Sequence, residues 1–280
     1  MIGKSLLRIA FALSPIGRWF FEYFVPRHHP AAAALLLAVG FGPTVTATEA
    51  MLRVLSYNIH HGCGSDGLVD LPRIAAVIRG AEADLVLLQE VDDRTERTDR
   101  VDQTAELARL TSLHGEFGRQ IDYQGGRYGQ AILSRTRLQK PRVHVLPGDP
   151  DRETRIAFSA RTEIAGRWIV IVGTHLHHRD PVERLKQAQT LATLDLGAGP
   201  MILGGDLNAV PESEPLAAIL ATWRSTTGEP LPTFPAADPT RQIDFIFYRP
   251  AGVLEAGPVR VLEEPVPSDH RPILAEFELH

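Results

Sequence analysis

The chain has 280 residues, enough for one large α/β domain with a substantial core or for two small domains. Apolar residues make up 44% of the chain and charged residues 22%, which is ordinary for a soluble globular protein. A single cysteine, Cys63, excludes an intramolecular disulfide framework and a cysteine-rich zinc module.

The charge balance gives no support for non-specific binding of long nucleic acids. The chain has 29 Lys and Arg against 34 Asp and Glu; the first fifty residues hold four and two of these, so the rest has a net charge of −7. Proteins that grip the phosphate backbone usually show a basic balance or patch. Aromatic residues, which stack on single-stranded bases, make up only 7%. Divalent ions or a local basic patch could replace overall charge, so a nuclease stays an alternative.

The first fifty residues differ in pattern from the rest. A basic start is followed by the apolar run AAAALLLAVGF at 31–41 and by small residues, VTA, at 45–47. This order is typical of a secretory signal, and the apolar run is short for a membrane span. We therefore expect a periplasmic, secreted or membrane-associated protein. Two alternatives stay open: a start at Met51, which would make the protein cytoplasmic, and an internal structural helix.

Apolar patterning predicts strands alternating with helices in the first half of the remaining chain. LRVLSYN, at 52–58, is rich in β-forming residues and ends at a polar one. Asp70 can cap a helix with apolar residues on one face over 71–78. DLVLLQE, at 84–90, predicts a buried strand that ends in a carboxylate, and a second helix is expected over about 102–113.

The second half continues in the same way. Asp180 and Pro181 are typical of a helix start, and apolar residues recur after them. The strands that we expect here lie at 128–135, 156–164, 168–176, 201–208, 243–249 and 273–279.

Several of these apolar strands end in a polar residue. Strands that are apolar throughout are covered on both faces, so their ends are where a layered α/β protein can gather side chains from distant parts of the chain. We therefore expect one domain over residues 51–280, with a site at the strand ends. The residues in question are Asn58, Glu90, His175, Asp206 and Asn208.

Glu90 follows the apolar run LVLL, which places it at the end of a deeply buried strand. A partly buried carboxylate needs a cation or strong hydrogen-bond donors. Mg²⁺ prefers oxygen ligands and meets that need, and Asn58 offers an amide oxygen to the same ion. A solvated strand-end glutamate is the alternative for Glu90 taken alone.

Asp206 and Asn208 stand in GGDLNAVP, where two glycines let the backbone bend closely beside a site. Asp206 can orient or deprotonate an attacking water, and Asn208 can donate to a phosphoryl oxygen. A simple turn after a strand is the alternative for this segment alone.

His270, in SDHRP, can transfer protons near neutral pH. Asp244 could accept a hydrogen bond from its ring and fix its orientation, in a relay where water is the nucleophile. Asp269 could support the metal ion or a metal-bound water. A capped turn before the last strand is the alternative.

Two further segments hold candidate histidines. His175, in THL, could donate to the phosphoryl group, and His178 in the following loop could touch substrate. His60 and His61 stand close to Cys63, which suggests a zinc hydrolase as an alternative, although recognisable zinc-ligand spacing is missing elsewhere. We interpret both as rim residues near the phosphate or leaving group.

Seven motifs occur in a fixed order across residues 56–272: SYN, LQEVD, YGQAILSR, THL, GDLNAVP, IDFIF and SDHRP. Together they resemble the endonuclease/exonuclease/phosphatase superfamily, which has the deoxyribonuclease I-like fold. The resemblance covers nearly the whole chain after Met51. It implies a four-layer α/β sandwich, with two packed mixed β-sheets flanked by helices, and an Mg²⁺- or Mn²⁺-dependent phosphoesterase.

The resemblance also implies roles for individual residues. Asn58 and Glu90 match metal-site positions, and Asp244 matches the partner of the general acid/base His270, with Asp269 before it as in the family.

Three further matches concern water and phosphate. Asp206 and Asn208 match the pair that handles water and phosphate, and His175 matches a phosphate-contacting histidine. Arg155 sits where relatives carry a substrate-binding arginine, although RET could align one step differently. His177 stands where the family often has an aspartate.

These features together predict a phosphodiesterase that uses a metal-polarised phosphate and an activated water. The expected substrate is a phosphodiester or phosphomonoester, for example a lipid or small molecule, and the expected state is a monomer without an obligate protein partner. A DNA endonuclease of the same family and a non-catalytic binding module are the alternatives. The presence of Glu90, Asp206 and His270 argues against the binding module.

Overall fold

The computed structural model describes residues 50–249 and 253–280. The predicted export segment, residues 1–50, lies outside the described residues except for Ala50. None of the helices in the described part of the chain has the length and apolarity needed to cross a membrane.

The first sheet has six strands in the order β11-β12-β1-β2-β4-β3, and only β1 and β2 are parallel neighbours. Its strands are β1 (Ala50–Asn58), β2 (Leu85–Asp93), β3 (His114–Tyr123), β4 (Gly126–Ser134), β11 (Leu254–Val261) and β12 (Ile273–Leu279).

The second sheet also has six strands, in the order β5-β6-β7-β8-β10-β9, and its parallel pair is β7 with β8. Its strands are β5 (Gln139–Val145), β6 (Ile156–Ile164), β7 (Arg167–His175), β8 (Met201–Asp206), β9 (Arg224–Ser225) and β10 (Asp244–Arg249).

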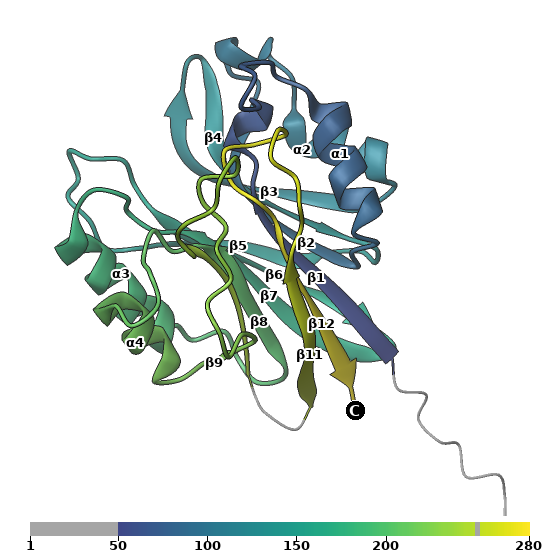
Figure 1. Ribbon diagram of the computed structural model, residues 1–280, viewed down its shortest axis with the longest axis vertical. Helices are drawn as coiled ribbons and strands as arrows, with labels where there is room; N and C mark the ends of the chain where they lie inside the picture. Colours follow the sequence, from purple (N-terminus) through teal and green to yellow (C-terminus); the bar gives the residue numbers. More distant parts are fainter. Residues whose placement is uncertain (1–49, 250–252) are drawn as a thin grey trace, which may run out of the picture. The chain divides into compact units, whose positions relative to one another are not determined.

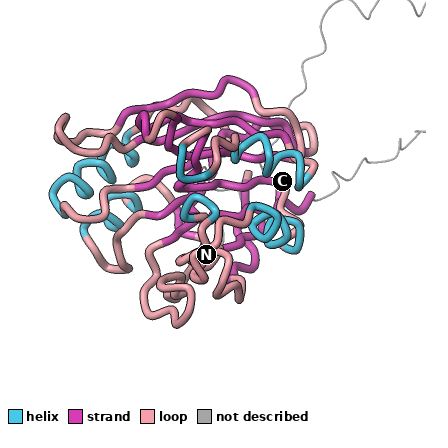
Figure 2. The backbone as a smooth tube through the Cα atoms, turned by 90° about the horizontal axis from the view of Figure 1, so that it is seen from above, coloured by secondary structure: helices cyan, strands magenta, loops and turns pink. Residues whose placement is uncertain are grey.

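Four α-helices flank the two sheets, with α1 and α2 on one side and α3 and α4 on the other (Figure 1). Figure 2 shows the same arrangement from above. The two predicted helix starts are confirmed: Asp70 accepts a hydrogen bond from the backbone N–H of Arg73, and Asp180 caps α3. Asp102, at the start of the second expected helix, caps α2. The helices are α1 (Leu71–Gly80), α2 (Gln103–Thr111), α3 (Pro181–Thr193) and α4 (Glu214–Leu220), and the short 3-10 turns are η2 (His60–Gly62) and η3 (Glu96–Thr98).

Strict alternation along the buried strands divides the core into layers. In β1, Leu52 and Val54 face the second sheet, whereas Leu55 and Tyr57 face α1 and α2. The second sheet does the same, with its outer face packed on α3 and α4. Two six-stranded sheets between two layers of helices confirm the predicted four-layer α/β sandwich.

The same alternation places the polar strand ends between the sheets. Ile202, Gly204 and Asp206 are alternate residues of β8, so they lie on the same face of the strand. That face is turned toward the first sheet. Asn58 follows Leu52 and Val54 at even spacing and points the opposite way, toward the second sheet. The predicted site residues therefore meet at one edge of the sandwich.

Glu90 is the exception, because alternation would place it on the helix-covered face with Leu88. A β-bulge corrects this: the pairing of β2 with β4 shifts register between Leu88 and Val91, and Glu90 has a φ of 57°. Bulges of this kind re-aim a side chain, and here the Glu90 carboxylate is directed to Asn58.

The glycines at the end of β8 allow the close approach that the sequence suggested. Gly205 has a φ of 155°, and a Cβ there would collide with the backbone of Thr174 in β7. A Cβ at Gly204 would press on Leu87 from the facing sheet. Only glycine lets β8 pass this close to both neighbours just before Asp206.

Gly205→Ala should therefore destabilise the protein by about 1–3 kcal/mol, the usual cost of overpacking a rigid core. Equilibrium urea unfolding measures the effect. The matched control is Gly80→Ala, at the end of α1, where a Cβ meets no neighbouring atom. Equal free energies of unfolding for the two variants would contradict this account of β8.

Candidate active site

Register across the second sheet places three polar residues in a row. Asp206 at the end of β8 pairs with His175 of β7 on one side and with Asp244 of β10 on the other. All three side chains are buried. The loop before β12 adds His270, and β1 of the facing sheet adds Asn58. The group therefore combines residues from five separate segments of the chain.

One oxygen atom, Oδ2 of Asp206, lies at the centre of this group. It accepts a hydrogen bond from Nδ2 of Asn58 at 3.2 Å, and it lies 3.4 Å from Nε2 of His175 and 3.7 Å from Nε2 of His270. The other oxygen, Oδ1, accepts from the backbone N–H of Asn208 at 2.8 Å. The carboxylate is therefore held from several sides in a place that excludes most water.

His270 is held by a second carboxylate. Its Nδ1 lies 2.9 Å from Oδ2 of Asp244, the pair that the sequence predicted. The same oxygen accepts from the hydroxyl of Thr233 at 2.6 Å, and the ring of Phe234 packs on the imidazole with centroids 4.8 Å apart. With Nδ1 turned to Asp244, Nε2 is the nitrogen that faces Asp206.

These contacts shift the pKa values of His270, Asp206 and His175 by different amounts and in different directions. Burial favours neutral His270, but the charges of Asp244 and Asp206 outweigh it and raise its pKa to about 10. Burial raises the pKa of Asp206 to about 7, against the opposing charge of His270. Burial and the charge of Arg155 hold the pKa of His175 well below its usual value. At neutral pH His270 is therefore charged, and His175 is neutral.

Glu90 joins the group through Asn58. The Asn58 amide Nδ2 donates to Oε1 of Glu90 at 3.0 Å as well as to Asp206, and its Oδ1 accepts from the backbone of His60 at 3.1 Å. In this structure the amide nitrogen of Asn58 faces the two carboxylates and orients them toward one place. An amide oxygen that accepts one N–H keeps a second lone pair, so the predicted role of Asn58 as a metal ligand stays a prediction.

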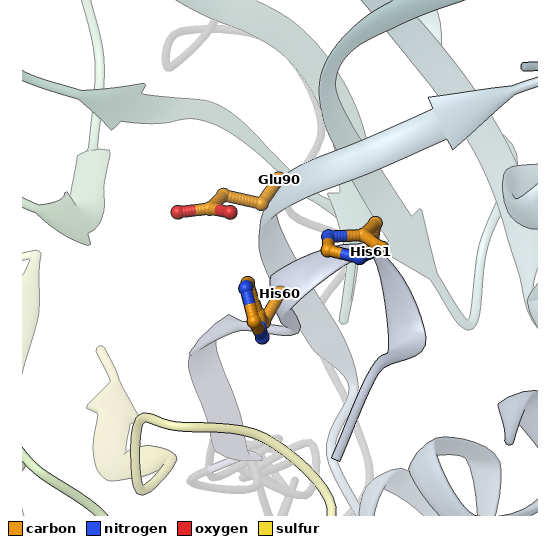
Figure 3. Close-up of side chains that lie close together, drawn as sticks. All are labelled: His60, His61 and Glu90. Atoms are coloured by element: carbon orange, nitrogen blue, oxygen red, sulfur yellow. The ribbon is translucent and has the colours of Figure 1, made fainter. Parts of the chain in front are cut away.

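This donor set fits a hard divalent ion, since the carboxylate oxygens of Glu90 and Asp206 meet at a single amide. Among the described residues, two clusters at this edge bring three potential ligand atoms within 4.8 Å of one another: Asp206 with Asp244 and His270, and Glu90 with His60 and His61 (Figure 3). Cys63 belongs to neither cluster. A third, Glu255 with Glu278 and His280, lies near the opposite end of β1.

The predicted substrate residues lie beside this group. Arg155 is 3% exposed, and its guanidinium lies 3.2 Å from Nδ1 of His178 and 3.4 Å from Glu153. Two further guanidinium nitrogens, Nε and Nη1, have no partner among the described residues. His178 lines a cavity of about 670 Å³ together with Arg152 and Arg179. Glu153 and Asp180 also line this cavity, so the unpartnered nitrogens of the buried Arg155, and not the charge of the cavity, are what suit an anionic group.

Two predicted residues have other neighbours than expected. The amide of Asn208 donates to the backbone oxygen of Leu176 at 3.1 Å, which fixes the turn after β8. Asp269 is half-exposed, and one of its carboxylate oxygens lies 3.9 Å from Nδ1 of His60. No described contact links Asp269 to Glu90, so its role at the metal stays a prediction.

Sequence reasoning missed two residues that hold the site together. Thr233 contacts Asp244, and the hydroxyl of Ser268 donates to the backbone oxygen of Asn58 at 2.7 Å and accepts from the backbone of His270. Ser268 stands inside the SDHRP motif, which could have drawn attention to it. Thr233 lies in a proline-rich loop without any motif, so only the fold reveals it.

Two packed mixed sheets flanked by helices define an α/β sandwich, and comparison with known proteins specifies which one. The model of the Endonuclease/Exonuclease/phosphatase family matches residues 55–270. The chain belongs to this family, whose members are phosphoesterases and nucleases. No curated protein matches the sequence.

Solved structures of the same fold come from distant organisms. An endonuclease/exonuclease/phosphatase from Beutenbergia cavernae is 25% identical, with a TM-score of 0.67 over 82% of this chain and 72% of that one. A mannosyl-6-phosphatase from Bacteroides thetaiotaomicron is 21% identical, with a TM-score of 0.66 over 81% and 99%. The human Nocturnin catalytic domain with bound sulfate is 22% identical, with a TM-score of 0.64 over 83% and 98%.

Asp244→Asn should lower the pKa of His270 from about 10, because the largest of the carboxylate charges that raise it is removed. NMR titration of the imidazole protons in the metal-free protein measures this. Because the pKa of His270 is higher in the folded protein than in the unfolded chain, its charge stabilises the fold fully below pH 6.5, and this stabilisation is lost as the pH rises through about 10. An unchanged His270 titration in the variant would contradict the pairing.

Proposed function

We propose that this protein is a divalent-metal-dependent phosphodiesterase. The observation that carries the proposal is the position of Oδ2 of Asp206, within 3.7 Å of His175 and His270 and bonded to the amide that also holds Glu90. A carboxylate, a charged imidazole and a second carboxylate in one buried group provide the parts for activating water beside a phosphate.

The metal is proposed to bind at Glu90, with Asp206 close by and Asn58 holding both carboxylates. Mg²⁺ or Mn²⁺ suits these oxygen donors. When bound, such an ion polarises the phosphate and neutralises charge on the leaving oxygen.

The protein's own groups then divide the proton transfers. Asp206, whose pKa is raised to about 7, can accept a proton from water near neutral pH, while His270, whose pKa is about 10, holds a proton on Nε2 that it can donate. Asp244 keeps the imidazole charged and oriented. His175, neutral and buried, offers a ring N–H to the phosphoryl group, and Arg155 adds a buried positive charge.

The substrate is proposed to be a lipid or small-molecule phosphodiester. The acidic balance of the domain supports this over long nucleic acid. The cavity of about 670 Å³ that His178 lines, next to Arg155, has room for one of the two ester groups of a phosphodiester. A phosphomonoester and DNA remain the other outcomes of the assay below.

The proposed localisation is outside the cytoplasm, on the signal-like pattern of residues 1–50, and the proposed state is a monomer. N-terminal sequencing of the protein isolated from its host tests the first, since a mature N-terminus near residue 48 would support export and one at Met51 would not. Sedimentation equilibrium tests the second.

His270→Gln should lower kcat for bis-p-nitrophenyl phosphate by about 100- to 10,000-fold, the usual contribution of a general acid or base. His114→Gln, an exposed residue of β3, is the matched control and should keep full activity. The same assay is repeated with p-nitrophenyl phosphate, sphingomyelin, phosphatidylinositol, inositol phosphates, RNA and plasmid DNA. Undiminished hydrolysis by the variant would rule out the proposed roles, and a folded wild type inactive on every substrate would favour a binding module.

Glu90→Gln should raise the Mg²⁺ concentration that gives half-maximal activity by at least about 10-fold, because even indirect metal partners have effects of that size. Chelation with EDTA should abolish wild-type activity, and added Mg²⁺ or Mn²⁺ should restore it. Glu163→Gln, an exposed carboxylate on β6, serves as the control. Full activity in EDTA would contradict the metal requirement.

A further inference from the structure

Two histidines and one carboxylate face each other beside the site already described (Figure 3). His60 and His61 lie in the turn η2 directly after β1, and Glu90 comes from the bulge in β2. One potential ligand atom from each of the three residues lies within 4.8 Å of the other two. All three are partly exposed, so an ion from solvent can reach them.

The hydrogen bonds of His60 leave one nitrogen free to bind a metal ion. Its Nδ1 lies 3.2 Å from the backbone oxygen of Cys63, and Asp269 offers a second acceptor at 3.9 Å on the same side. Nδ1 therefore carries the proton, and Nε2 carries the lone pair. A histidine that donates one ring N–H to a carbonyl in this way is prepared to bind a metal through the other nitrogen.

His61 supplies the second nitrogen ligand. Its ring lies edge-on to that of His60 with centroids 4.5 Å apart, and its buried Nδ1 has no hydrogen-bond partner among the described residues. Its backbone oxygen accepts from Nε2 of Gln103 at 2.7 Å, which ties this turn to α2. The two imidazoles are therefore carried on a segment that is anchored to a neighbouring helix.

We propose that His60, His61 and Glu90 form a second cation site, selective for a borderline ion such as Zn²⁺ over Mg²⁺. Two imidazole nitrogens and one carboxylate are a donor set used by catalytic zinc sites, where water occupies the fourth position. Mg²⁺ prefers oxygen ligands, so the two nitrogens discriminate against it. Cys63 takes part only through its backbone oxygen.

The consequence is a pair of different ions that share Glu90. One would lie toward Asn58 and Asp206, and the other toward the two histidines at the rim. Two cations at one carboxylate can hold both sides of a reacting phosphate group. The binding itself does not depend on the proposed function, because it is measured without substrate.

The test is equilibrium binding of Zn²⁺ and Co²⁺ to the metal-free full-length protein in excess Mg²⁺. The wild type should bind one Zn²⁺, and bound Co²⁺ should give visible ligand-field bands without thiolate charge transfer. The double substitution His60→Gln and His61→Gln should weaken Zn²⁺ binding at least about 10-fold. Cys63→Ser and His114→Gln are the matched controls and should bind as the wild type does.

Several outcomes would overturn the inference. These are equal Zn²⁺ affinity in the wild type and the double variant, loss of binding in Cys63→Ser, and failure of Zn²⁺ to bind in the presence of excess Mg²⁺. Melting temperatures without metal establish that the variants fold, and if the double variant does not, His60→Gln alone is measured in its place. A wild-type protein that binds Zn²⁺ as expected but hydrolyses no phosphodiester would contradict the proposed function and would still support this cation site.

Discussion

The site depends on the burial of one carboxylate, that of Asp206. A carboxylate removed from water requires donors or positive charge in compensation. Asn58 and the backbone of Asn208 provide the donors, and His270 provides the charge. His270 can stay charged in the core only because Asp244 lies on its other side. Two acids and one imidazolium are thus stable together, and their protonation states differ from those of the free side chains.

Much of this arrangement could be predicted because strand ends are visible in a sequence. Apolar runs that stop at Asn58, His175 and Asp206 predict buried strands, and side-chain alternation then decides which face each residue occupies. The parallel pairs β1–β2 and β7–β8 bring those ends to one edge. The order of motifs predicted the family, which the match over residues 55–270 confirms. The assigned roles of single residues stay predictions until they are measured.

The rest depends on local geometry that patterns do not encode. Alternation alone would turn Glu90 away from the site, and only the bulge in β2 redirects it. The orientation of the Asn58 amide follows from a competing backbone N–H at His60. Thr233 supports Asp244 from a loop with no recognisable motif. The edge strands β3, β5, β9 and β11 also escaped prediction, because partly exposed or very short strands lack continuous apolar runs.

The hydrogen bonds of Asn58 connect the two halves of the sandwich. Its amide belongs to the first sheet, and one of its bonds reaches Asp206 in the second, 148 residues further along the chain. Gln130 of β4 also donates to the backbone oxygen of Ile156 in β6 at 3.1 Å, and the hydroxyls of Ser134 and Thr162 lie 3.4 Å apart across the sheets. The rest of the contact between the layers is apolar and has no preferred direction. A slip of one sheet over the other by a fraction of a side chain would leave helices and strands intact and separate the two acids. Catalytic activity therefore responds to smaller changes in the alignment of the two sheets than a measurement of helix and strand content does.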